Sequence, residues 1–137
     1  EYYKVQENRI ESSPYLKGAV HYDGFGKDME GWFSKIGYIL STSDFEGSHL
    51  SVAEAMASGS SPIIIKWDGA DEIYPKENCF DDISNATEYI LNETDESFTN
   101  HLSQNKKFVK EFDIKHIMKQ WMEVINNNQS TKIGLNH

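Results

Sequence analysis

The sequence predicts an α/β fold in which a parallel β-sheet is flanked by helices. Short β-branched or aromatic runs alternate along the chain with segments whose apolar residues recur every three or four positions. One run, 62–65, is apolar throughout, which is typical of a strand buried on both faces of a parallel sheet. Alternating strands and helices favour right-handed crossover connections. We therefore expect a doubly wound α/β domain, or part of one, with three or four strands.

The N-terminal third contains two expected strands and one expected helix. Residues 1–17 are polar and mixed, and Pro14 ends any helix that precedes it. Residues 19–22 are predicted as a strand that ends in a glycine-rich turn. Asp28 can cap a helix that runs to position 36, because apolar residues recur there at helical spacing. Gly37 ends that helix, and 38–41 is predicted as the second strand.

The middle of the chain carries the third strand, preceded by a helix. That helix is expected to begin near Ser48 as its N-cap and to end at Gly59, in a left-handed position. The strand follows at 61–66. A loop with a short helix at 71–74 leads to a fourth short strand at 78–80.

The C-terminal part is predicted to be helical, with helices at 83–91, 97–111 and 114–126. The last helix has an apolar stripe, expected to pack in the core, formed by Ile114, Ile117, Met118, Trp121, Met122 and Ile125. Residues 1–126 are thus expected to form one domain, and 127–137 a loose polar tail. So few strands, and a first residue that is not Met, lead us to expect that further strands precede Glu1 in a longer parent chain.

The composition limits the classes of function. The net charge is −9, which disfavours general binding to nucleic acid or to anionic membranes, since phosphate neutralisation requires Lys and Arg. A single cysteine, Cys79, permits no internal disulfide, which favours a reducing compartment. The five histidines lack the spacing of a metal site, so no metal or cofactor is expected.

The segment from Gly47 to Ile65 carries one formal charge, that of Glu54. The surrounding alanines and the following strand predict a buried helix, and an unpaired buried carboxylate is costly. Two interpretations are open: Glu54 faces water as an ordinary surface residue, or it faces a ligand.

The loop before this helix lies where a ligand would bind. Ligands of open α/β sheets bind at the carboxyl ends of the strands, and a helix N-terminus there offers free N–H groups to an anion. Gly47 allows close approach of a ligand to the backbone. With a diphosphate at the helix start, Glu46 could accept from sugar hydroxyls on one side and Glu54 from a ribose on the other. This order suggests a nucleotide-sugar.

These residues resemble a known signature. Glu46, seven residues and Glu54, followed by Ala-Met-Ala-Ser-Gly, are similar to the E-x7-E motif of retaining GT-B glycosyltransferases, family 4 in particular. The flanking segments 20–24, 32–43, 69–73 and 112–121 are also similar, so the resemblance covers about 18–125. It implies a Rossmann-like parallel sheet, namely the C-terminal, donor-binding half of a GT-B fold without its first strands.

The resemblance also assigns roles to individual residues. It implies that Glu46, the expected catalytic residue, contacts the donor sugar and that Glu54 contacts the ribose. The backbone of Gly47, Ser48, His49 and Leu50 would face the sugar and diphosphate. The implied reaction is metal-independent transfer with retention from a UDP- or GDP-linked sugar to a glycan or lipid-linked acceptor, with the departing diphosphate stabilising the transition state. The implied location is cytoplasmic, with peripheral association of the parent at the inner face of the membrane.

The chain departs from the family pattern in three ways. The Gly-x-Pro-Val expected after the helix is one residue longer here, at 59–63. Ser48 and His49 replace the usual Phe-Gly pair, so His49 is either an additional donor toward a phosphate or sugar hydroxyl or simply a residue at the helix start. The acceptor-binding domain, and the Arg and Lys that grip the diphosphate, find no counterpart. We therefore expect the fragment alone to be inactive. The alternatives are a non-catalytic nucleotide-sugar-binding module of the same fold, and a GT-B relative with phosphorylase or epimerase chemistry.

Overall fold

A three-stranded parallel sheet forms the centre of the molecule. The computed structural model describes residues 1–47 and 49–133, with side chains up to Asn127. The strands are β1 (Tyr38–Ser41), β2 (Ser61–Ile65) and β3 (Cys79–Phe80), in the spatial order β1-β2-β3. Leu40 lies opposite Ile63, and Ile65 lies opposite Phe80. The predicted α/β class with an open parallel sheet is therefore confirmed.

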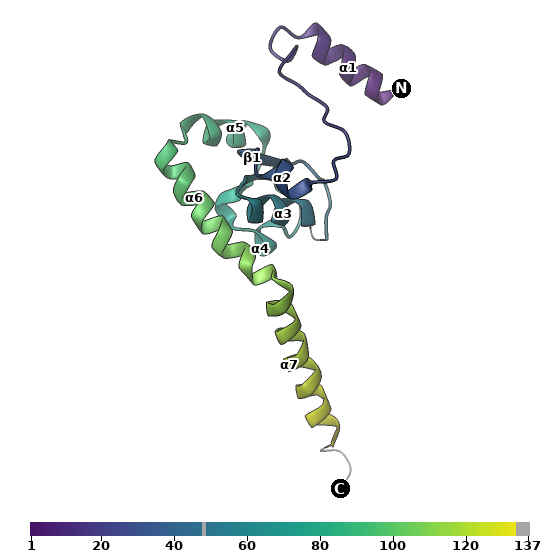
Figure 1. The fold of residues 1–137 in the computed structure, drawn as a ribbon, viewed down its shortest axis with the longest axis vertical. Coiled ribbons are helices and arrows are strands. Elements are labelled where there is room, and N and C mark those ends of the chain that lie inside the picture. Colours follow the sequence, from purple (N-terminus) through teal and green to yellow (C-terminus); the bar gives the residue numbers. More distant parts are fainter. Residues whose placement is uncertain (48, 134–137) are drawn as a thin grey trace.

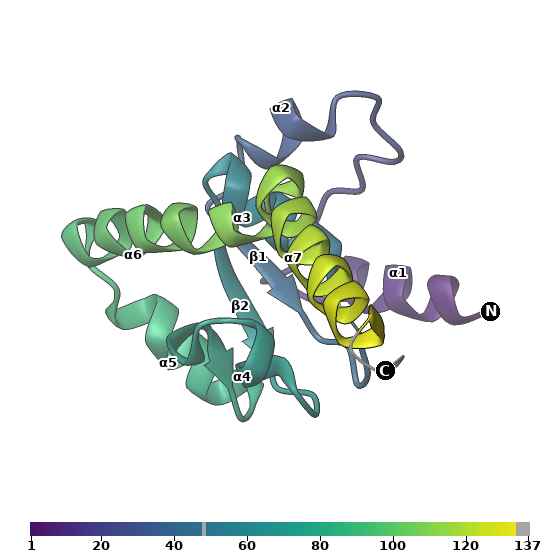
Figure 2. The ribbon, with the colours of Figure 1, turned by 90° about the horizontal axis from the view of Figure 1, so that it is seen from below.

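Seven α-helices are described around and beyond this sheet. They are α1 (Tyr2–Ser12), α2 (Met29–Phe33), α3 (Leu50–Ser58), α4 (Ala70–Ile73), α5 (Ile83–Asn92), α6 (Asp95–Phe108) and α7 (Ile114–Ile133), with 3-10 turns at Lys76–Asn78 and Val109–Phe112. Helices α3 and α6 pack on β2 and on each other, and α5 packs on β2 and β3. Figure 1 shows α1 set apart at the end of an extended segment and α7 projecting from the body, and Figure 2 shows the sheet with α5 and α6 beside it.

The core lies between β2 and α3. Ile63 and Ile64 of β2 are buried, as predicted from the continuous apolar run. From α3, Val52, Ala55 and Met56 are buried, and their spacing of three and four places them on one face of the helix. Burial of such side chains is worth about 1.5–3 kcal/mol each, so this strand–helix pair anchors the fold.

Local sequence signals set several helix ends correctly. Asp28 caps α2, where its carboxylate accepts from the backbone N–H of Gly31 at 2.9 Å. Gly59 ends α3 with a φ of 104°, the left-handed region that favours glycine. At the other end of α3 the N-cap is His49, and the predicted cap, Ser48, lies outside the described residues.

Three expectations differ from the structure. Residues 19–22 form no strand: they are exposed, and the N–H groups of Ala19 and Val20 donate to the Leu16 carbonyl in a turn instead of to a neighbouring strand. The apolar stripe of α7 has the predicted helical spacing, but Trp121 is 61% exposed because the helix leaves the body instead of lying on it. Helix α7 also continues past position 126 to Ile133, so residues 127–133 of the expected loose tail are helical, and 134–137 lie outside the described residues.

A buried carboxylate joins β1, α5 and α6 on the side of the sheet away from the predicted site. Glu93, whose side chain is 2% exposed, accepts from the Tyr38 hydroxyl at 2.6 Å and the Tyr89 hydroxyl at 3.1 Å. The Nδ1 atom of His101 lies 2.5 Å from the same carboxylate. Burial and the neighbouring Glu93 raise the pKa of Tyr38 to about 12. This cluster fixes the start of α6 against the sheet.

Candidate functional site

The candidate site is the connection between β1 and α3, residues 41–50, which we call the loop–helix junction. It begins at Ser41, the last residue of β1, and ends at Leu50, the first residue of α3. Because β1 is parallel to β2, this connection lies at the carboxyl edge of the sheet, as the sequence predicts. In the first turn of α3 the Val52 N–H donates to the His49 carbonyl, whereas the N–H groups of Leu50 and Ser51 have no acceptor among the described residues. The junction therefore presents donors and the positive end of the helix dipole.

Glu46 is held in the junction by a local hydrogen bond. The Ser43 hydroxyl donates to Glu46 Oε1 at 2.9 Å, and the side chain is half-buried. Within the part of the chain that is described, Oε2 has no hydrogen-bond partner. A carboxylate fixed through one oxygen can accept from a ligand hydroxyl through the other. The arrangement is therefore compatible with the role expected for Glu46.

His49 is fixed at both its side chain and its backbone. The Ser41 hydroxyl lies 2.9 Å from His49 Nδ1. The His49 carbonyl accepts from the Tyr74 hydroxyl at 2.7 Å and from the N–H of Val52 at 3.0 Å, the first turn of α3. These contacts hold the start of α3 against the end of β1 and against the segment after α4.

Hydrogen bonds join Ser41, His49 and Tyr74 into one cluster at the carboxyl edge of the sheet. Burial, and then the negative charge of Glu46, raise the pKa of the Tyr74 hydroxyl, with a smaller contribution from Cys79. Glu46 lies in the same loop, three residues before His49, and its own hydrogen bond is with Ser43. Sequence reasoning missed Ser41 and Tyr74, because the signal that links them to the site is their distance in space and not their spacing along the chain.

Glu54 is exposed, and the prediction that it lies on a buried helix is wrong. The buried face of α3 is the narrow stripe formed by Val52, Ala55 and Met56, which leaves Glu54 and Ala57 on the solvent side. Ala55 is buried, but Ala53 is only half-buried and Ala57 is exposed, so the alanines around Glu54 do not show which face of the helix is covered. Within the described residues the Glu54 carboxylate has neither a hydrogen-bond nor an ion-pair partner.

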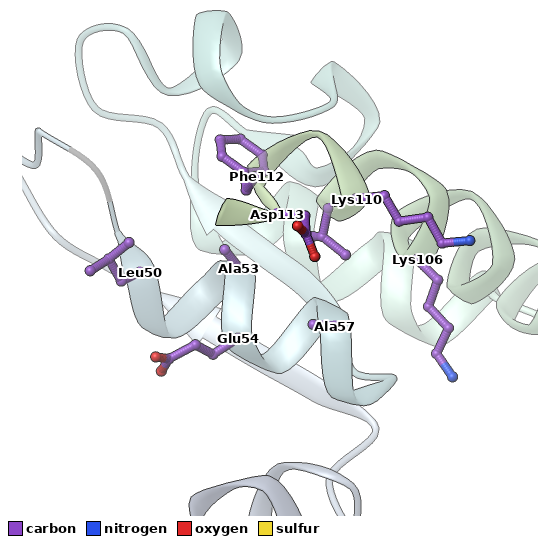
Figure 3. Close-up of a pocket in the computed structure, with 9 residues that line it drawn as sticks. Leu50, Ala53, Glu54, Ala57, Lys106, Lys110, Phe112 and Asp113 are labelled. Atoms are coloured by element: carbon purple, nitrogen blue, oxygen red, sulfur yellow. The ribbon is translucent and has the colours of Figure 1, made fainter. Parts of the chain in front are cut away.

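Two shallow grooves meet at Glu54. One, of about 510 Å³, lies between α3 and the end of α6, where Lys106, Lys110 and Asp113 line it. The other, of about 440 Å³, lies between α2 and α3 and includes Glu30. Figure 3 shows the Glu54 side chain directed away from Lys106 and Lys110, so no ion pair closes the first groove. Glu46 lines neither groove.

The remaining predicted site residues are Gly47, Ser48 and Leu50. Gly47 is exposed, and a Cβ there would meet no atom within 4 Å, so packing does not require glycine at this position. Leu50 is exposed and lines the larger groove. Ser48 lies outside the described residues. The structure therefore brings Glu46, Gly47 and His49 together in the junction, with Glu54 one turn further along α3. Their binding roles stay predictions.

Over residues 1–47 and 49–133, no group of three His, Cys, Asp or Glu side chains is arranged to hold a metal ion. In the same part of the chain, no helix combines the length and apolar character needed to cross a membrane. No family model, curated protein or solved structure with which we compared the chain matches it.

Proposed function

We propose that this chain is the donor-binding part of a retaining, metal-independent glycosyltransferase of GT-B type, and that the loop–helix junction binds a nucleotide-sugar. The observation that carries the proposal is the placement of two carboxylates around one helix N-terminus. Glu46 precedes α3 and, among the described residues, has no partner for Oε2; Glu54 lies four residues inside the helix, about 6 Å along its axis from Leu50.

The chemistry between the two carboxylates suits a diphosphate. The first turn of α3 supplies backbone N–H donors and the positive end of a dipole, which stabilise an anion without a metal. Gly47 leaves space beside the backbone, and packing within the protein does not account for that glycine. From Ile36 to Ile65 the chain has neither Lys nor Arg, so backbone donors and His49 would bear this task within the segment.

A sugar and a ribose would then occupy the two ends of the ligand. Ionised carboxylates accept from hydroxyl pairs and cannot donate, so they select polyols over further anions. We assign the donor sugar to Glu46 and the nucleotide ribose to Glu54. The groove between α3 and α6, which Glu54 and Leu50 line, offers a surface for the remainder of the nucleoside.

The proposal is tested by ¹⁵N-HSQC titration of the chain with UDP, GDP, ADP and CDP, which also detects millimolar affinities. We expect one nucleotide to shift the amide signals of Gly47 and of residues 49–54. We expect Glu54→Gln to lower the affinity for that nucleotide about tenfold, since a hydrogen bond to a charged group is lost. Glu88→Gln, an exposed carboxylate on α5, is the matched control and should leave the response unchanged.

The donor sugar is tested in a second titration. The corresponding nucleotide-sugar should bind more tightly than the bare nucleotide. Glu46→Gln should remove this difference in affinity and should not change the affinity for the bare nucleotide. A well-folded sample whose junction amides respond to none of the four nucleotides contradicts the proposal. Equal affinities for nucleotide and nucleotide-sugar would favour a nucleotide-binding module without transfer.

A further inference from the structure

The hydrogen bond between Ser41 and His49 orients the His49 ring at the start of α3. We infer that Ser41 is a positioning residue that fixes His49 with its proton on Nε2, so that Nε2–H donates to a phosphate oxygen of the bound nucleotide diphosphate. This inference rests on the proposed function and assigns a specific donor within it.

The surroundings of Ser41 determine which way its hydrogen bond points. Ser41 is 1% exposed, so its hydroxyl has no access to water. Among the described residues, His49 Nδ1 is the partner that the structure gives to this hydroxyl. If Nδ1 carried the proton, the Ser41 hydroxyl would accept it and its own proton would have no acceptor in the described surroundings. A buried donor without an acceptor is unfavourable, so the hydroxyl donates to Nδ1.

The direction of that bond sets the tautomer of the neutral ring. An imidazole whose Nδ1 accepts a hydrogen bond carries its proton on Nε2. Nε2 is the remaining polar atom of the ring, and within residues 1–47 and 49–127 no side chain or carbonyl binds it. His49 is half-buried, and the Nδ1 edge of its ring lies against Ser41.

The backbone of His49 is fixed as well, which makes the ring a defined donor instead of a mobile one. The Tyr74 hydroxyl and the Val52 N–H both bind its carbonyl. The imidazole therefore extends from a fixed point directly before the free N–H groups of α3, where an anion is stabilised. A side-chain donor and the backbone donors can then bind the same phosphate.

A catalytic Ser-His pair is the competing interpretation, and the geometry contradicts it. A serine nucleophile must reach its substrate, whereas Ser41 is buried at the end of β1. The hydroxyl instead serves to orient the ring.

The tautomer is measured first, on the free protein, from the imidazole nitrogen shifts in long-range ¹H–¹⁵N spectra. We expect the proton of neutral His49 on Nε2, and a mixture of tautomers in Ser41→Ala. A wild-type ring with its proton on Nδ1 overturns the inference, whatever the protein binds.

Binding is measured next, by titration with UDP, GDP, ADP and CDP. For the nucleotide that binds, His49→Ala should weaken affinity about tenfold or more, as expected for a donor to a charged group. His49→Gln places an amide near the position of Nε2 and should retain most of the affinity, whereas His49→Asn reaches only the position of Nδ1 and should not. Ser41→Ala should weaken binding about threefold or more.

Ser60→Ala is the matched serine control. Its buried hydroxyl donates to the carbonyls of Phe33 and Ile36 at the opposite edge of the sheet, so this variant should lower stability without changing affinity. If a nucleotide binds but His49→Ala and His49→Asn bind it as tightly as wild type, the inference fails and the proposed function stands. If no nucleotide binds a folded sample, both fail, and the measured tautomer is then a structural feature only. The two His49 variants keep the test decisive if Ser41→Ala does not fold.

Discussion

Replacing Glu93 by Gln should destabilise the protein strongly. The Glu93 side chain is 2% exposed and accepts from Tyr38 and Tyr89, with His101 Nδ1 at 2.5 Å. Glutamine has one acceptor oxygen and brings an NH₂ group, so at least one of these donors would face another donor. A lost hydrogen bond to a charged group costs about 1.5–3 kcal/mol, so we expect the free energy of unfolding to fall by about 2–3 kcal/mol at pH 7.

The assay is urea unfolding followed by circular dichroism and tryptophan fluorescence. Glu88→Gln, an exposed carboxylate of the same helix, is the control and should change stability by less than about 0.5 kcal/mol. A double-mutant cycle with Tyr38→Phe should give a coupling energy of about 0.5–3 kcal/mol, because the two side chains share a hydrogen bond. A loss below about 0.5 kcal/mol for Glu93→Gln would refute the reasoning.

The effect of this substitution should depend on pH in a defined direction. Burial alone raises the pKa of Glu93, but hydrogen bonds from Tyr38, His101 and Tyr89 outweigh it, and the net pKa is lowered. A carboxylate whose pKa is lower in the folded than in the unfolded state stabilises the protein at pH values above the unfolded-state pKa, about 4.3. This stabilisation is lost as the pH falls through the folded-state pKa of the same carboxylate. The difference between wild type and Glu93→Gln should therefore be largest near neutral pH and shrink below about pH 4. A difference that stays constant down to pH 3 would exclude a role for the charge.

Three further predictions concern the rest of the fold. Gly59→Ala should lower the free energy of unfolding in urea by about 1–2 kcal/mol, because alanine is strained at a φ of 104°. Gly26→Ala is the control and should change this free energy far less, because a Cβ there meets no atom within 4 Å and φ is not left-handed. Asp82→Ala should cost about 1 kcal/mol in the same assay, because the carboxylate caps α5 through the N–H groups of Ser84 and Asn85. Cys79 should react with a thiol reagent at pH 8 only as fast as the protein opens, since burial raises its pKa to about 11; a rate equal to that of free cysteine would contradict its buried position.

Local features of the sequence predicted much of the fold because they act over a few residues. The continuous apolar run before Lys66 predicts the central strand, and Gly59 predicts the end of α3. Both signals depend on the conformational preferences of a few adjacent residues. The strand expected at 19–22 has a suitable composition. A strand also needs a neighbour that accepts its hydrogen bonds, and composition carries no information about that.

Burial of individual side chains was harder to predict than helix position. The apolar stripe of α7 has a correct period, yet Trp121 is exposed because the period says which residues share a face and not whether that face is covered. Ala57, near Glu54, is exposed although Ala55 is buried, since alanine favours helices equally well at a surface. In the candidate site, Glu46, Gly47 and Glu54 follow from their spacing. Ser41 and Tyr74 do not, because folding alone brings them to His49.

The all-parallel pairing of the sheet has a consequence for how the chain folds. Since β2 pairs with β1 and with β3 in parallel, no two strands can be joined by a tight hairpin, and each pairing must wait until a crossover has closed. Loop closure before strand pairing slows folding, so the first structure to form should be local. Helix α3 and strand β2 are consecutive, joined at Gly59 and Ser60, and they share the core. We expect this pair to be the folding nucleus, onto which β1 and β3 are added later from either side.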